Sequence, residues 1–264
     1  MRHRPLRISI AVILATLALQ AKASKCGADA QSTIATDRPQ TTESSIVVPC
    51  GSLQFENGFL ETSAGHQWGL DLPETWMRFG ISGKGELRFA VPDYFTNAFT
   101  GSGFAKGASD INIGYKQQLG PVKGFDVSLI PSFTIPTGAA GITSGGYDPA
   151  IQLPWSRSLS KNWTAAGMFS VMWPTQGARR NVTGQSCIYF DRQLTAPWDA
   201  YIEYSEDSPE HGSPQHAIDI GSAFKLSPHQ QVDFHWSFGL SAAAPDSTVG
   251  LGYSVRFQVA RARQ

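Results

Sequence analysis

His235 and Ser237 are the two residues whose types and spacing come nearest to those of an enzyme. Asp233 precedes His235 by two positions and Ser237 by four, so in an extended strand all three side chains lie on one face. A histidine beside a hydroxyl, oriented by a carboxylate, can activate the serine as a nucleophile, as in lipid hydrolases. These residue types are common, however, and Phe238 stands where such a motif continues with Asn. We therefore expect no catalytic residue, no metal site and no cofactor.

Charged residues occupy alternate positions in many other segments, with apolar residues between them. The signs nearly balance, with seven acids and five bases, whereas a ring of one sign would select ions of the other. Two uses remain open: a lattice of cross-strand salt bridges that stiffens and fills a closed sheet, or the lining of a narrow polar path for small solutes. The full set is Glu56, Arg78, Glu86, Arg88, Asp110, Lys116, Asp126, Glu203, Asp219, Lys225, Asp233, His235 and Arg256.

The clearest element that could position these residues is the stretch 249–259. Six apolar residues alternate with five small or polar ones, from Val249 to Val259. This period of two predicts a β-strand with one apolar and one polar face. Eleven residues is also about the length of a tilted membrane-spanning strand.

The same pattern recurs from Ser52 onward and predicts twelve strands. Clusters of Gly, Pro, Asn, Asp or Ser separate them. We expect the strands at 52–62, 74–81, 84–92, 109–119, 124–136, 147–159, 162–174, 182–194, 197–206, 214–226, 229–240 and 247–258.

The connections alternate between short turns and longer polar loops. The longer ones are expected at 63–73, 93–108, 137–146, 175–181, 207–213 and 241–246. In an antiparallel meander, this places all long loops at one end and both chain ends at the other. Outer-membrane barrels have this arrangement.

The apolar face could point inward, as in a secreted soluble β-protein, or outward, toward lipid. Two features favour the outward direction. Trp155, Trp163, Trp173 and Trp198 lie near expected strand ends on the apolar face, as in membrane-interface girdles. The opposite face carries too many ions for a dry core, where each unpaired charge costs several kcal/mol. The fold class expected is all-β: a transmembrane antiparallel up-and-down β-barrel of about 12 strands over 52–258.

Residues 1–23 have the pattern of a secretory signal peptide. Arg2, Arg4 and Arg7 precede an apolar run of thirteen residues, and 21–23 has the small-x-small form of a cleavage site. Its removal leaves 17 basic and 21 acidic side chains, so the mature chain has no basic excess for nucleic acid. Residues 24–51 lack clear periodicity and are either a periplasmic segment or a plug of the lumen. Residues 259–264 form a C-terminal tail.

The three cysteines show no metal-ligand spacing. A bridge between Cys26 and Cys50 is chemically allowed in an oxidising compartment, although the sequence does not require it. In the expected loop 93–108, Phe95, Phe99 and Phe104 are candidates for an apolar contact with an aromatic or lipidic solute; pinning of the loop to the rim is the alternative.

Several short motifs resemble those of a known family. They are Thr36-Asp37-Arg38-Pro39, the opening stretch 51–59, Glu74-Thr75, Glu86-Leu87-Arg88, Gly124-Phe125-Asp126, the Leu-Pro-Trp-Ser at 153–156, and the closing stretch 250–257. Together they resemble the bacterial transporter family named for the MetA pathway of phenol degradation. The resemblance covers most of the chain after residue 23. It implies an outer-membrane β-barrel that admits small organic compounds.

The sequence thus predicts a monomeric channel or transporter in the bacterial outer membrane, for small aromatic or hydrophobic compounds. Its expected partners are outer-membrane lipids, a small-molecule solute and the barrel-assembly machinery, and not nucleic acid. A closed structural barrel or receptor without flux is the alternative within this fold.

Overall fold

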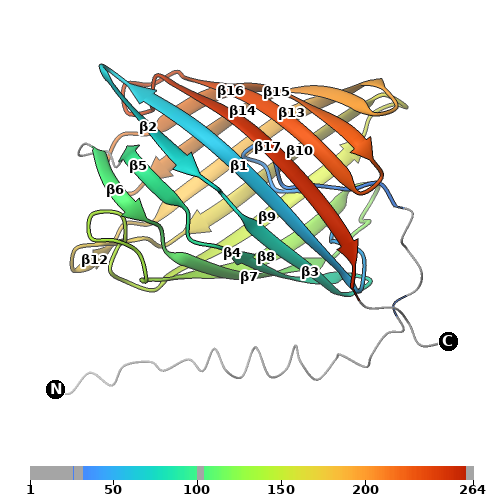
Figure 1. Cartoon of the computed structure of the whole chain (residues 1–264), viewed down its shortest axis with the longest axis horizontal. Helices are drawn as coiled ribbons and strands as arrows, with labels where there is room; N and C mark the ends of the chain where they lie inside the picture. Colours follow the sequence, from blue (N-terminus) through green and yellow to red (C-terminus); the bar gives the residue numbers. More distant parts are fainter. Residues whose placement is uncertain (1–25, 27–31, 100–103, 260–264) are drawn as a thin grey trace.

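A computed structural model describes residue 26 and residues 32–99 and 104–259. The expected signal peptide and most of the C-terminal tail lie outside these residues. The structure is a closed antiparallel β-barrel (Figure 1). Its twelve barrel strands are β1 (Ser52–Ala64), β3 (Trp76–Ser82), β4 (Gly85–Ala90), β7 (Ile111–Gln118), β8 (Asp126–Ile135), β9 (Asp148–Ser158), β10 (Trp163–Met172), β13 (Thr183–Thr195), β14 (Trp198–Pro209), β15 (Gln215–Ser227), β16 (Gln230–Gly239) and β17 (Ser247–Gln258).

The first and last barrel strands close the sheet. β1 pairs with β17 without interruption, from Ser52 opposite Gln258 to Ser63 opposite Ser247. Closure leaves no unpaired edge, which a sheet in lipid requires because the bilayer core offers no hydrogen-bond partners. The prediction of a twelve-stranded barrel is confirmed. No helix in the described part of the chain is long and apolar enough to cross a bilayer.

The barrel is apolar outside and polar inside. Large apolar side chains on its outer face are well exposed, among them Phe169 (60%), Leu251 (54%) and Trp163 (42%). The largest fully buried side chains are instead mostly polar or charged, and they include Arg78, Arg88, Lys116, Glu56 and Glu86. A few apolar groups, such as Ile130 and Met168, are also buried. This reversal of the usual soluble pattern matches the period-two alternation of a membrane barrel.

Two expected loops are wrong, because they contain strands. Residues 63–73 include β2 (Gln67–Leu72), and 93–108 include β5 (Tyr94–Phe99) and β6 (Phe104–Ala108). β2 pairs with the end of β1, and β5 lies between β2 and β6. A third expected loop, 175–181, holds the short hairpin of β11 (Thr175–Gln176) and β12 (Arg179–Arg180).

These additional strands continue three barrel strands past a break. β2 leads into β3, β4 into β5, and β6 into β7, with interruptions at 73–75, 91–93 and 109–110. Backbone hydrogen bonds from Gly58 to Pro73 and from Val91 to Thr75 keep the pieces aligned. Pro73 and Pro92 lack an N–H and cannot donate to a ladder, which accounts for two of the interruptions.

The outward orientation of Phe169 in the middle of β10 can be tested by substitution. Phe169→Arg should lower the free energy of unfolding in lipid vesicles by about 2–4 kcal/mol, because an arginine near the bilayer centre is poorly solvated. Tyr147→Arg is the matched control, since Tyr147 is 64% exposed in the connection before β9. Urea titration of the refolded protein would measure both changes, and equal losses for the two variants would contradict the orientation.

Candidate functional site: a segment of the chain inside the barrel

Residues 32–51, here called the N-terminal segment, run inside the barrel and touch strands on opposite sides of it (Figure 1). Backbone groups of the segment bond to Glu203 on β14, Glu86 on β4 and Ser128 on β8. Ile34, Thr42, Ser45 and Val48 of the segment are almost completely buried. A disulfide joins Cys26 to Cys50, immediately before the barrel begins.

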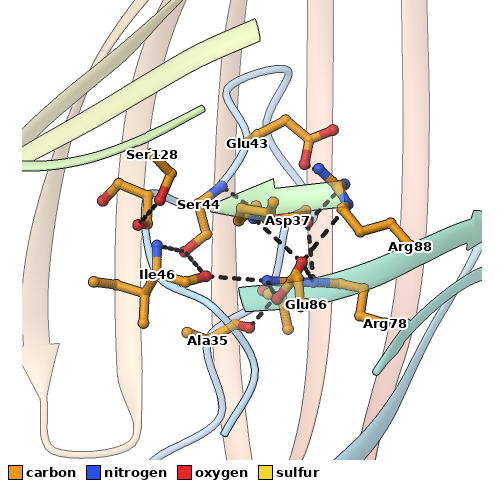
Figure 2. Close-up of polar contacts among 12 residues, drawn as sticks. Ala35, Asp37, Glu43, Ser44, Ile46, Arg78, Glu86, Arg88 and Ser128 are labelled. Atoms are coloured by element: carbon orange, nitrogen blue, oxygen red, sulfur yellow. Dashed lines mark hydrogen bonds and ion pairs between the residues drawn. The ribbon is translucent and has the colours of Figure 1, made fainter. Parts of the chain in front are cut away.

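Asp37 is the centre of the ionic contacts between the segment and the wall (Figure 2). Its carboxylate lies 2.9 Å from Lys116 Nζ, 2.8 Å from Arg88 and 3.2 Å from Arg78. Burial alone would raise the pKa of Asp37, but the attraction of these three cations outweighs it and holds the pKa well below its usual range. Asp37 therefore stays ionised at any physiological pH.

The wall contains a like-charge pair that Asp37 separates. Arg78 on β3 stands directly opposite Arg88 on β4, a placement that is destabilising when nothing lies between the charges. The carboxylate of Asp37 contacts both guanidinium groups, and Glu86 binds Arg78 at 2.8 Å. Arg78 also donates to the carbonyl oxygens of Ala35 and Ile46, which fixes the segment on both sides of its turn (Figure 2).

Glu43 completes this inner ionic cluster, which consists of Asp37, Glu43, Glu56, Arg78, Glu86, Arg88 and Lys116. Glu43 pairs with Arg88, yet burial raises its pKa to about 7, with the charge of Asp37 adding to the effect. The two acids share a hydrogen bond, which requires Glu43 to hold the proton. With Glu43 protonated, three cations face three anions and the cluster is neutral.

Glu203 holds the other side of the segment. One carboxylate oxygen accepts from the Thr41 amide at 2.7 Å, and the other accepts from the amide and hydroxyl of Thr42 at 2.9 and 2.6 Å. These three donors satisfy a carboxylate that is only 1% exposed and has no basic partner among the described residues.

Arg38 connects the segment to the break between β2 and β3. Its guanidinium pairs with Glu74 and lies 3.7 Å from Asp233. It also lies over Gly58, where a Cβ atom would come within 2.3 Å of it, so only glycine allows this approach. Glu74 has a φ of 40°, an uncommon value for a residue other than glycine. This backbone holds the Glu74 carboxylate against Arg38.

The residues expected to line the lumen fall into three groups. The first group is buried and contacts the N-terminal segment: Glu56, Arg78, Glu86, Arg88, Lys116, Glu203, Asp233 and Arg256. Asp219 and His235 are buried elsewhere in the interior, and Asp110, Asp126 and Lys225 are partly exposed near strand ends. Asp110 accepts from Gly138 and Thr143 in a long loop, and Lys225 pairs with Asp199 at 2.8 Å. The N-terminal segment covers the first group, and its Asp37 and Glu43 pair with Arg78, Arg88 and Lys116 of that group.

The histidine and serine considered for catalysis are not joined. His235 Nδ1 lies 3.0 Å from Asp219, which also accepts from the Tyr201 hydroxyl, and no hydrogen bond links His235 to Ser237 within the described residues. The orienting carboxylate is thus Asp219 on the neighbouring strand and not Asp233. Among the described residues, no group of three or more His, Cys, Asp or Glu is arranged to hold a metal ion. Of the loop phenylalanines, Phe95 and Phe99 lie on β5 and Phe104 on β6.

Residues of the N-terminal segment are the part of the site that sequence reasoning did not assign. Asp37 and Arg38 stand in a motif noted for its resemblance to a family, but no periodicity indicates their partners. Their ion-pair partners lie 36 to 195 positions away in the chain. The only local signal was the Thr-Asp-Arg-Pro motif itself, placed between an unpatterned stretch and the first strand.

The sequence profile of the family described as "Putative MetA-pathway of phenol degradation" matches residues 36–257. The chain belongs to this family. The match begins at the Thr-Asp-Arg-Pro motif, so it includes most of the N-terminal segment as well as the barrel. No curated protein matches the chain.

Solved structures of outer-membrane proteins share this fold at low sequence identity. An outer-membrane channel from Pseudomonas putida F1 superposes with a TM-score of 0.61 at 11% identity, covering 83% of this chain and 99% of its own. The NanC porin gives 0.56 at 9%, covering 77% and 98%. The KdgM porin, solved with disordered oligogalacturonate, gives 0.54 at 8%, covering 78% and 99%.

Removing the charge of Asp37 should destabilise the protein strongly. Asp37→Asn leaves Arg78 and Arg88 facing each other, and breaking a buried ion network in this way costs about 3–5 kcal/mol. Asp126→Asn is the matched control, because Asp126 lies on β8 and, within the described part of the chain, makes no ion pair to the N-terminal segment. Urea unfolding in detergent would measure both. A loss for Asp37→Asn within about 1 kcal/mol of the control's would contradict the assigned role.

Glu43 should make the protein less stable as the pH rises. The pKa of Glu43 is about 7 in the folded protein and 4.5 as an ordinary value, so the folded state binds the proton more tightly. Its contribution is complete below about pH 4.5 and is lost as the pH rises through 7.

The variant Glu43→Gln keeps a hydrogen-bond donor and has no charge to lose. It should exceed the natural protein in free energy of unfolding by about 1–3 kcal/mol at pH 8. The two should agree at pH 4. An equal or lower stability of the variant at pH 8 would show that Glu43 acts chiefly as an anion for Arg88.

Proposed function

We propose that this protein is an outer-membrane channel for small organic solutes, and that its N-terminal segment is the constriction of that channel. The observation that carries the proposal is a closed barrel of twelve strands whose polar interior is occupied by a segment of its own chain. Eight strands enclose only side chains, whereas twelve enclose enough space to hold this segment as well.

The placement of the N-terminal segment suits a constriction of the channel better than a structural element that the barrel needs in order to close. Its twenty residues form no strand, and the barrel wall closes without them through β1 and β17. The segment is held by side chains from several strands, of which Glu203 and the inner ionic cluster provide most contacts. Such contacts can be broken individually without opening the sheet.

Family membership and structural neighbours support the class of solute and the location. The family is described by a pathway of phenol degradation, which suggests small aromatic compounds. The structural neighbours are an outer-membrane channel and two porins, which favours a location in the outer membrane. KdgM was solved with an anionic oligosaccharide. The interior of the present chain has more acids than bases, which favours neutral or positively charged solutes instead.

Loosening the N-terminal segment should raise the conductance. Glu203→Gln removes the charge that holds Thr41 and Thr42 from β14, while the inner ionic cluster stays intact. In planar bilayers, we expect the variant to open more often, or to a higher conductance, than the natural protein.

Asp126→Asn is again the control and should conduct like the natural protein. A heat-dependent shift on a detergent gel would verify that each variant is a folded barrel. If Glu203→Gln is folded and conducts no more than the control, the N-terminal segment is not the constriction. If every form is silent, including one without residues 32–49, the protein is a closed structural barrel.

A further inference from the structure

Four carboxylates lie around the single guanidinium of Arg38. We call these four residues the outer carboxylate cluster. Its members are Asp71 on β2, Glu74 in the β2–β3 break, Asp93 in the β4–β5 break and Asp233 on β16. Glu74 bonds to Arg38, Asp233 lies 3.7 Å from it, and Asp71 and Asp93 interact with its charge. The inner ionic cluster balances its charges, whereas this one has three more acids than bases.

Asp71 is the clearest sign that the cluster lacks a positive partner. It is 8% exposed, and its Oδ1 atom has no hydrogen-bond partner among the described residues. By strand alternation it shares the inward face of β2 with Gly69, while Trp68 and Leu72 are exposed on the other face. A buried polar atom without a partner costs free energy, so a native structure retains one where something else satisfies it.

The titration of the cluster agrees with its geometry. Burial and Glu74 raise the pKa of Asp93 to about 6. Burial is the larger cause, and the charge of Glu74 adds to it. A further cation beside Asp93 would lower this pKa.

The kind of cation follows from the donors present. No metal-type arrangement of three or more ligands occurs among the described residues, which disfavours a coordinated metal ion. The group already bound there is a planar guanidinium, held between carboxylates on β16 and in the β2–β3 break. Carboxylates at such spacing suit delocalised or multi-donor organic cations. Glu74, with a side chain 20% exposed, is a member that solvent reaches.

We propose that the outer carboxylate cluster binds the positively charged group of a small organic solute, a guanidinium or a primary ammonium. The solute would contact Asp71 and compete with Arg38 for Glu74 and Asp233. Because Arg38 belongs to the N-terminal segment, a solute bound there acts directly on the proposed constriction. This inference builds on the proposed channel, but binding at the cluster can be measured without flux.

Asp71→Asn separates a binding role from a structural one. If Asp71 only stabilised the fold, its replacement would lower the free energy of unfolding. Asp71 Oδ1 is buried with no hydrogen-bond partner among the described residues, so replacement of Asp71 by the neutral isostere should leave the free energy of unfolding unchanged or higher. The same change should weaken the binding of a cation, because it removes one charge-assisted contact.

The experiment is isothermal titration calorimetry on the full mature chain, folded in detergent at pH 8.5. The probes are N-acetylarginine amide, which is a cation, and N-acetylcitrulline amide, its neutral isostere. We expect binding of the cation only, with affinity reduced about tenfold in Asp71→Asn and unchanged in the control Asp126→Asn. Asp233→Asn should also weaken binding, since Asp233 lies on the other side of Arg38.

Three results would overturn the proposal. They are equal binding of the neutral probe, absence of binding by the cation at millimolar concentration, and unchanged affinity in a folded Asp71→Asn variant. Conductance measured on the same preparations separates failure of the proposed cation site from failure of the proposed channel. A conducting protein without cation binding refutes the cluster alone, whereas binding by a protein that never conducts refutes the channel and leaves the cluster as a receptor site.

Discussion

The direct opposition of Arg78 and Arg88 on neighbouring strands is the constraint on which the rest of the interior depends. Two guanidinium groups at this spacing repel, and burial removes the water that would screen them. Glu86 compensates Arg78 from within the wall, but Arg88 obtains its close carboxyl contacts from the N-terminal segment, from the ionised Asp37 and from Glu43. The barrel wall and the segment within it are therefore one electrostatic unit.

The same constraint explains why the segment needs no regular structure. Backbone groups of an irregular chain must find partners wherever they are buried. Here the partners are side chains of the barrel wall. Arg78 donates to two backbone carbonyl oxygens of the segment, and Glu86 and Glu203 accept from its backbone N–H groups. Ion pairs and backbone bonds thus use the same wall residues, and a single carboxylate such as Glu203 can hold two consecutive residues of the segment.

The wall could be predicted from the sequence because it follows a local rule. Period-two alternation predicted the twelve strands. Glu56, Arg78 and Lys116 are buried inside the barrel, as expected for the polar face of each strand. The alternation of Trp68, Leu70 and Leu72 also indicated β2, but Pro73 and the neighbouring glycines made the region resemble a loop. The path of the N-terminal segment could not be predicted in this way. Its partners are side chains that closure of the whole barrel brings together, and a single sequence carries no local pattern for such contacts.

The charges around Asp37 and those around Arg38, on the two sides of the segment, differ in how completely they are paired. Around Asp37, three cations meet three anions once Glu43 is protonated, so displacement there would uncover several buried charges at once. Around Arg38, four carboxylates share one cation, and Glu74 is partly exposed. Removing Arg38 uncovers acids that can be neutralised by protons or by another cation, among them Asp93, whose pKa burial already raises. Of the two contacts, the one at Arg38 can be exchanged for an external partner, whereas the one at Asp37 has no such replacement.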